Sequence, residues 1–310
     1  MSITVLGECV ADAFATDGRP GELSLTVHPG GGPANTATAL ARLGTRTRFL
    51  GRLAADPFGA LFRDRLAGSG VDLSGCVAAA EPSTLAIAAL DAEGRAGYTF
   101  HAEGTADFQW QPAELATVDL TKSVAVHTGS LALVRAPGAA AVEELLARAG
   151  AHATVSIDPN LRPLLVAPER YRERMAAWCA LTDLLRLSAD DLALLHPDQP
   201  VAEVLDHWHQ LGVPLIVLTL GEQGALASLH GERVRIEAAP VQVVDTVGAG
   251  DAFTAGLLHH LSQAGLLGGR LNALTVDQMA DACRFAATVA ALTCSVAGAN
   301  PPWAAQLTTP

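Results

Sequence analysis

Residues 245–251 read DTVGAGD, and the apolar segment AFTAGLLHHL follows them. The small residues Gly248, Ala249 and Gly250 let the backbone approach a ligand closely, and N–H groups at the start of a helix can bind an anion. The carboxylate of Asp251 would repel that anion but could accept a proton. The segment therefore indicates either an anion-binding turn beside a base or an ordinary glycine-rich turn whose aspartate begins a helix. The spacing of these residues alone does not distinguish the two interpretations.

A second glycine-rich segment, PGGGPANTATALARLG, spans residues 29–44. Its glycines leave room for a polyhydroxylated ligand to reach the backbone, and Asn35 offers a donor and an acceptor to a pair of sugar hydroxyls. Taken alone, the segment is more simply interpreted as a tight turn that caps a helix. We expect that helix at 36–43, with Gly44 ending it.

Strands and helices must hold these two segments together. Beyond a first strand at 3–6, apolar strands and helices alternate from about residue 123. We predict strands at 123–131, 153–160, 183–188 and 214–221, helices at 138–150, 169–182, 189–196 and 201–212, and a hairpin at 225–230 and 232–238. This alternation predicts a mostly parallel sheet covered by helices on both faces.

Polar residues follow several of the predicted strands. They are Glu8, Asp12, Gly129, Ser130, Asp158, Asn160, Ser188 and the residues 219–222. Ligands of open parallel sheets bind beyond the carboxyl ends of the strands. The convergence of these residues on one edge therefore predicts an enzyme with a ligand-binding crevice there.

Early segments do not follow the strand–helix alternation. Residues 21–30 alternate like an exposed strand, and 84–90 and 96–100 flank the turn 91–95 as a hairpin. We expect a small β lid, drawn from about 10–32 and 84–110, on a single domain that spans 1–310. This appendage would serve as a lid or a dimer surface.

Composition excludes several classes of function. The chain has 310 residues, half of them hydrophobic, and a net charge of -12, so we expect no basic surface for nucleic acid or anionic lipid. No apolar run approaches the length of a membrane span, and the first residues lack the features of a signal peptide. The five cysteines are scattered, which favours reduced thiols in a cytoplasmic protein.

Together the two glycine-rich segments resemble the two signatures of the PfkB, or ribokinase-like, family of carbohydrate kinases. GGGPANTATALARLG is similar to the amino-terminal signature and DTVGAGDAFTAG to the carboxy-terminal one, and the likeness extends through GECVADAF at the start and TLGEQGAL at 219–226. The resemblance implies an α/β, ribokinase-like three-layer fold with a mostly parallel central sheet, helices on both faces and a small β lid. It also implies ATP-dependent phosphorylation of a sugar hydroxyl.

The resemblance gives the opening segment its roles. Asp251 would take the proton from the attacking sugar hydroxyl, and the backbone of Gly248, Ala249 and Gly250 would hold the transferred phosphoryl group. An aspartate at a helix N-terminus should be ionised and only weakly basic. That suffices, because phosphoryl transfer depends mainly on positioning and charge stabilisation.

Other matching residues would bind the sugar. The resemblance assigns this role to Asp12, Gly30, Gly31 and Asn35. Asn160 and Arg162, in the stretch DPNLR, would face the phosphate or sugar crevice. A surface salt bridge is a serious alternative for Arg162.

The nucleotide would lie against two further segments. Thr219 and Gly221 match positions near the ATP phosphates and ribose, and Gly298 and Ala299 match positions beside the adenine.

Metal-binding residues are also implied. Asp245 and the carbonyl of Val247 match part of a monovalent-cation site, for K⁺ or a similar ion. Many members organise Mg²⁺ through an Asn-x-x-Glu element. In the matching stretch, Ser188 replaces the amide and would still lie at the cofactor, while Asp191 replaces the glutamate with a shorter carboxylate.

The sequence leaves the substrate open. Pro33 and the stretch SIDPNLRP at 156–163 resemble the fructokinase-like branch. Members of that branch usually carry an arginine shortly before the element matched by GTAD, where this chain has Ala102 and Glu103. A nucleoside kinase, a kinase of another neutral polyol and a non-catalytic sugar- or nucleotide-binding relative remain alternatives. Pairing of two lids would give a homodimer.

Overall fold

The computed structural model describes residues 1–17, 21–90 and 96–307. Its centre is an eight-stranded sheet in the order β14-β13-β12-β11-β10-β9-β1-β4. The strands are β1 (Ser2–Leu6), β4 (Thr47–Leu50), β9 (Ser123–Gly129), β10 (Thr154–Asp158), β11 (Leu184–Ser188), β12 (Leu215–Thr219), β13 (Ala225–Leu229) and β14 (Glu232–Ile236). All neighbouring pairs from β4 to β12 are parallel, and the pairs β12–β13 and β13–β14 are antiparallel.

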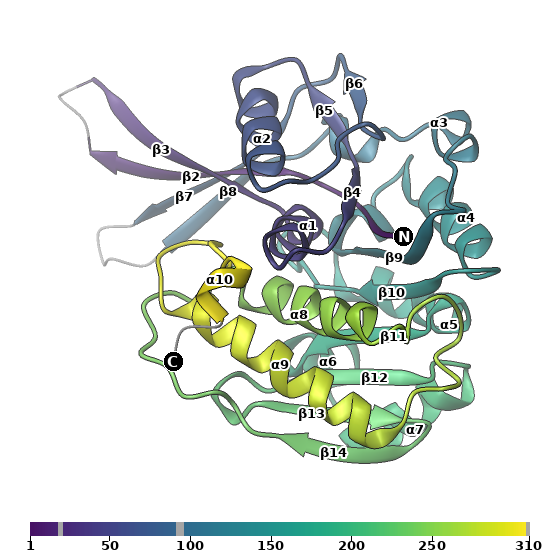
Figure 1. The fold of residues 1–310 in the computed structure, drawn as a ribbon. Coiled ribbons are helices and arrows are strands. Elements are labelled where there is room, and N and C mark those ends of the chain that lie inside the picture. Colours follow the sequence, from purple (N-terminus) through teal and green to yellow (C-terminus); the bar gives the residue numbers. More distant parts are fainter. Residues whose placement is uncertain (18–20, 91–95, 308–310) are drawn as a thin grey trace.

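Helices cover both faces of this sheet, because successive side chains of a strand point to opposite sides. Leu215 and Val217 of β12 belong to one core, and Ile216 and Leu218 to the other. The first core lies under α1 (Gly32–Arg42), α2 (Pro57–Gly68), α8 (Ala249–Gln263) and α9 (Val276–Cys294). The second lies under α3 (Pro112–Ala116), α4 (Ala139–Ala149), α5 (Pro168–Leu181), α6 (Ala189–Leu195) and α7 (Val201–Gln210). The predicted three-layer α/β arrangement is confirmed (Figure 1).

A second sheet projects from one edge of the molecule (Figure 1). It has the order β3-β2-β7-β8 and comprises β2 (Val10–Asp17), β3 (Leu23–Gly30), β7 (Thr84–Leu90) and β8 (Ala96–His101). These strands come from the two ranges in which we expected a lid, and the predicted turn at 91–95 lies outside the described residues. A separate pair joins β5 (Arg52–Ala54) to β6 (Val77–Ala79).

The base of the second sheet is tied to the body by one buried carboxylate. Asp107 lies in a short 3₁₀ helix, η1 (Ala106–Phe108), and accepts the backbone N–H of Cys9 at 2.8 Å and the hydroxyl of Thr84 at 2.7 Å. Cys9 directly precedes β2, and Thr84 begins β7. One side chain therefore fixes the points at which both central strands of the second sheet leave the body.

Two helices begin earlier than the sequence predicts, and both differences involve the glycine-rich segments. α1 begins at Gly32 rather than residue 36, because Pro33 is well tolerated in a first helical turn. α8 begins at Ala249 rather than after Asp251, with Gly248 in the left-handed conformation (φ 77°) just before it. Asp251 therefore lies in the first turn of α8. Among the described residues, no helix is both long and apolar enough to span a membrane.

Candidate active site

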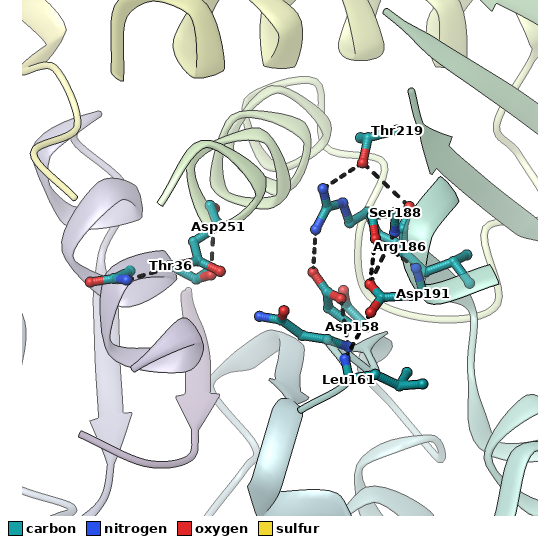
Figure 2. Close-up of polar contacts among 12 residues, drawn as sticks. Thr36, Asp158, Leu161, Arg186, Ser188, Asp191, Thr219 and Asp251 are labelled. Atoms are coloured by element: carbon teal, nitrogen blue, oxygen red, sulfur yellow. Dashed lines mark hydrogen bonds and ion pairs between the residues drawn. The ribbon is translucent and has the colours of Figure 1, made fainter. Parts of the chain in front are cut away.

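The two glycine-rich segments meet where α1 and α8 begin side by side (Figure 2). The side-chain N–H of Asn35 donates to Oδ2 of Asp251 at 2.9 Å, and the hydroxyl of Thr36 donates to the Asp251 carbonyl at 3.4 Å. Segments far apart in the sequence thus place an amide suited to a sugar against the carboxylate expected to act as base.

Asp251 is a buried carboxylate, 8% exposed. Burial raises its pKa to about 6, against the hydrogen bond from Asn35 and the positive charges of Arg162 and Arg186, which lower it. A helix N-terminus lowers the pKa of an aspartate, which is why the sequence predicts a weak base here. Burial raises the pKa by more than the helix lowers it. The group is therefore ionised at neutral pH but more basic than an exposed aspartate.

The glycine run 30–32 is packed so closely that side chains would not fit. A β-carbon on residue 30 would overlap the carboxylate of Asp12, and one on Gly31, whose φ is 101°, would lie 2.5 Å from the carbonyl oxygen of Glu8. On Gly32 it would lie 2.9 Å from Nδ2 of Asn160 and 3.3 Å from Oδ1 of Asp251. The run is therefore surrounded by polar groups of three separate segments.

Two of the predicted sugar-binding side chains carry opposite charges. Burial raises the pKa of Asp12 to about 6, and the nearby charge of Arg162 lowers it in part. Nη1 of Arg162 donates to the side-chain oxygen of Asn160 at 2.6 Å and to the carbonyls of Asn160 and Leu161. Arg162 is thus held by its own loop, and it forms no salt bridge with another residue in the described part of the chain.

A cavity of about 380 Å³ opens beside the start of α8. Its lining includes seven residues that we predicted for the site, which are Asn160, Arg162, Ser188, Asp191, Gly248, Gly250 and Asp251. Leu161, Arg186, Asp190 and Leu194 complete the lining. Asp12, Gly30 and Asn35 are not part of this lining; Gly30 packs against Asp12, and Asn35 contacts Asp251.

The backbone N–H groups at the start of α8 are not equally free to bind a ligand. The N–H of Ala249 donates to the carbonyl of Thr246 at 3.2 Å. The N–H groups of Gly250 and Asp251 lie in the first turn of α8, where a helix provides no internal acceptor. The anion-binding capacity predicted for the turn therefore rests mainly on these two groups.

Ser188 and Asp191 form a capping box at the start of α6. The Ser188 hydroxyl accepts the N–H of Asp191 at 3.0 Å, while Oδ2 of Asp191 accepts the Ser188 hydroxyl at 2.7 Å. Oδ1 of Asp191 accepts the N–H of Leu161 at 2.9 Å. Both oxygens of this carboxylate thus brace the cavity wall. In the part of the chain that the structure describes, no three His, Cys, Asp or Glu side chains are grouped to hold a metal ion.

Gly298 and Ala299, predicted to lie beside the adenine, contact the residues predicted for the monovalent cation and the turn that follows them. The Asp245 carboxylate accepts the N–H of Val247 at 3.0 Å and that of Gly298 at 2.8 Å, and these bonds hold its pKa below the usual range. Ala299 packs on Gly248, since a β-carbon there would lie 2.7 Å from the Ala299 β-carbon. The tail segment is therefore fixed against the turn before α8. Gly221 begins η3 (Gly221–Gln223), just after β12.

Arg186 is the main residue that sequence reasoning missed. Its Nη1 donates to Oδ2 of Asp158 at 2.7 Å, and its Nη2 donates to the hydroxyl of Thr219 at 2.6 Å (Figure 2). The segment DLLRLS predicts a buried strand, and nothing in its pattern shows which groups the side chain of Arg186 would contact. Its neighbours in space come from other strands and from α8.

A guanidinium also lies near the position where the sequence lacked one. Arg135 follows η2 (Ser130–Leu133), donates to the Ala102 carbonyl at 3.2 Å and pairs with Glu103 at 2.6 Å. Its guanidinium lies 5.1 Å from the centre of the Phe108 ring. A guanidinium therefore lies beside Glu103 although the local sequence provides none, because Arg135 comes from a distant segment.

Known proteins match the chain along nearly its full length. The model of the pfkB family of carbohydrate kinases matches residues 1–306. A fructokinase of Klebsiella pneumoniae is 36% identical over 295 residues, which cover 93% of each chain. Among solved structures, fructokinase from Vibrio cholerae O395 bound to fructose, ADP and calcium is similar with a TM-score of 0.82, 29% identity, and coverage of 96% and 94%.

A further solved structure has a different acceptor. It is the aminoimidazole riboside kinase of Salmonella enterica, bound to aminoimidazole riboside and an ATP analogue, with a TM-score of 0.84, 27% identity, and coverage of 99% and 98%. The match to the family model extends over both glycine-rich segments and the strands that carry the cavity. The chain therefore belongs to the pfkB family of carbohydrate kinases, and it is a sugar kinase.

Proposed function

We propose that this sugar kinase transfers the γ-phosphoryl group of ATP to a hydroxyl of fructose, with Asp251 as the general base. The observation that carries the proposal is the 2.9 Å hydrogen bond between Asn35 and Asp251, which joins the predicted sugar segment to the predicted base. The fructose-bound relative from Vibrio cholerae and the fructokinase of Klebsiella pneumoniae support fructose as the acceptor.

In the proposed reaction, the fructose oxygen bonds to the γ-phosphorus as the bond from that phosphorus to the leaving ADP oxygen breaks. The proton of the attacking hydroxyl passes to Asp251, whose pKa of about 6 leaves it ionised at neutral pH. The N–H groups of Gly250 and Asp251 stabilise the charge on the transferred group. Asp12, Gly30, Gly31, Asn35 and Asn160 orient the sugar.

The nucleotide lies along the cavity, with Ser188, Thr219 and Gly221 toward its phosphates and ribose, and Gly298 and Ala299 beside the base. Mg²⁺ supplies positive charge to the phosphates when it is bound. Mg²⁺ is usually held by one or two carboxylates together with substrate phosphates, and the cavity lining offers Asp190 and Asp191. The Asp245 carboxylate and the Val247 carbonyl would hold a monovalent cation such as K⁺.

The test is ADP release with a panel of acceptors, comprising fructose, other ketoses, aldoses, sugar acids, adenosine and aminoimidazole riboside. We expect fructose to give the highest kcat/KM. A nucleoside with a higher kcat/KM would make the chain a nucleoside kinase. Absence of turnover with every acceptor, in protein that binds ATP, would favour a non-catalytic binding protein.

We also propose that two chains pair through the second sheet. Large apolar side chains are exposed on three of its strands, with Phe14 46%, Leu23 68% and Tyr98 56% exposed. Burial of such a surface against a second copy would remove it from water.

A further inference from the structure

Arg186 is a buried cation directly beneath the first turn of α8. Its side chain is 7% exposed, and that of its partner Asp158 is 5% exposed. A β-carbon on Gly250 would lie 2.6 Å from Nη1, 2.8 Å from Nη2 and 3.0 Å from Cζ of Arg186. The guanidinium therefore packs against the Cα of Gly250, which explains why this position of the motif lacks a side chain.

The guanidinium of Arg186 has a fixed orientation, but not all of its hydrogen-bond donors have a partner. Arginine has five N–H donors. Asp158 accepts from Nη1, Thr219 accepts from Nη2, and the buried Nε has no partner. Asp158 is the last residue of β10, and Thr219 is the last residue of β12. Two strands of the central sheet therefore fix the plane of the guanidinium. Arg186 also lines the same cavity as Gly248, Gly250 and Asp251.

We propose that Arg186 binds the phosphates of the nucleotide and stabilises the phosphoryl group during transfer, with Asp158 and Thr219 as positioning residues. This inference rests on the proposed function only in taking ATP as the phosphoryl donor. A guanidinium suits phosphate because it offers several donors in one plane and remains charged. The Gly250 and Asp251 N–H groups then contact the phosphoryl group from one side and Arg186 from another.

The charges around Arg186 explain why it needs Asp158. The charge of Asp158 contributes to raising the pKa of both Asp191 and Asp251, and the charge of Arg186 lowers the pKa of Asp251. Without its ion pair, Arg186 would be a buried cation of high free energy in the unliganded protein. Asp158 stabilises the guanidinium when the cavity holds no nucleotide and leaves its remaining donors for phosphate.

The proposal is tested by nucleotide binding, measured calorimetrically without sugar. Arg186→Gln should weaken binding of a non-hydrolysable ATP analogue with Mg²⁺ by at least about tenfold, as expected for a lost hydrogen bond to a charged group. Adenosine, which has no phosphates, should bind within about twofold of wild type if the variant acts only through phosphates. Arg186→Lys should be intermediate, since it keeps the charge but loses the planar donors.

Two further variants keep the test decisive. Arg186→Gln leaves Oδ2 of the buried Asp158 without its ion pair, which destabilises the fold, so Arg186→Gln combined with Asp158→Asn removes both charges. Arg52→Gln is the matched control, since Arg52 is equally buried and pairs with Glu81 and Glu114 outside the cavity. It should leave binding of both ligands unchanged. The proposal is overturned if the double variant binds the ATP analogue as wild type does, or loses adenosine and the analogue equally. Because no sugar is present, either result is independent of whether fructose is the acceptor.

Discussion

Asp251 is subject to opposing influences on its proton affinity. Burial and the charge of Asp158 raise its pKa, while Asn35, Arg162 and Arg186 lower it, and the balance is a pKa of about 6. An aspartate in water titrates near 4, so this carboxylate is a stronger base when ionised. The protein obtains this basicity by placing Asp251 within the first turn of α8, where it is covered on several sides.

The pH dependence of kcat/KM should reflect this balance. The reaction needs the ionised form of Asp251, so we expect kcat/KM for fructose to be constant near pH 8 and to fall as pH decreases through about 6. Burial raises the pKa of Asp12 to about 6 as well, and its ionised form is the stronger acceptor for sugar hydroxyls. ADP release is measured from pH 5 to pH 9 with Mg²⁺ in excess. A rate that stays constant down to pH 5 would show that neither carboxylate has the raised pKa.

Gly32 provides a steric test of the space between the sugar segment and the base. In Gly32→Ala the new methyl group lies 2.9 Å from Asn160 and 3.3 Å from Asp251, so kcat/KM for the sugar should fall by at least about tenfold. The free energy of unfolding should change by less than about 1 kcal/mol, since alanine suits a helix. Gly68→Ala, at the end of α2 with nothing near its β-carbon, is the matched control. Equal activity of the two variants would place the sugar elsewhere.

At the scale of elements, the second sheet depends on the buried contacts of Asp107. This carboxylate joins η1 to the beginnings of β2 and β7, and β2 carries Asp12 toward the glycine run. A small displacement at this junction would therefore also displace Asp12, which we predict to bind the sugar.

Asp107→Ala should destabilise the protein by about 1–3 kcal/mol, because the N–H of Cys9 and the hydroxyl of Thr84 lose a buried acceptor. Urea unfolding measures this change. The exposed residue Asp64 on α2 supplies the control, and Asp64→Ala should stay within about 0.5 kcal/mol of wild type. If the two variants are equally stable, Asp107 does not hold the junction.

The sequence predicts some elements of this site well and others poorly, for physical reasons. The strands of the central sheet follow from their apolar runs, and the junction of Asn35 with Asp251 follows from two long motifs. The starts of α1 and α8 are missed, because glycine and proline predict turns where these helices already have their first residues. Arg186 and Arg135 are missed because their partners come from distant segments that local patterns do not connect.

On the scale of the whole molecule, the body and the second sheet differ in how they bury apolar surface. The body has helices on both faces of its sheet, whereas the second sheet exposes Phe14, Leu23 and Tyr98. Such a surface is more stable against another protein surface than in water.

We therefore expect the protein to sediment at twice the mass of one chain. Leu23→Glu combined with Tyr98→Glu places charges on this surface and should give monomers at micromolar concentration, since a charge buried without a partner opposes association. Val201→Glu, on the exposed end of α7, should remain dimeric. A wild-type protein that sediments as a monomer, or a double variant that stays dimeric, would refute pairing through the second sheet.

The most direct test of the account is the effect of Asp251→Asn on phosphoryl transfer from ATP to fructose. The amide keeps the shape of the side chain but cannot accept the proton, so we expect kcat to fall by at least about 10²-fold. Affinity for a non-hydrolysable ATP analogue should change little, because the backbone of the turn is preserved. ADP release and calorimetry measure the two quantities on the same preparation. A variant that binds nucleotide and phosphorylates fructose at near the wild-type rate would contradict Asp251 as the base.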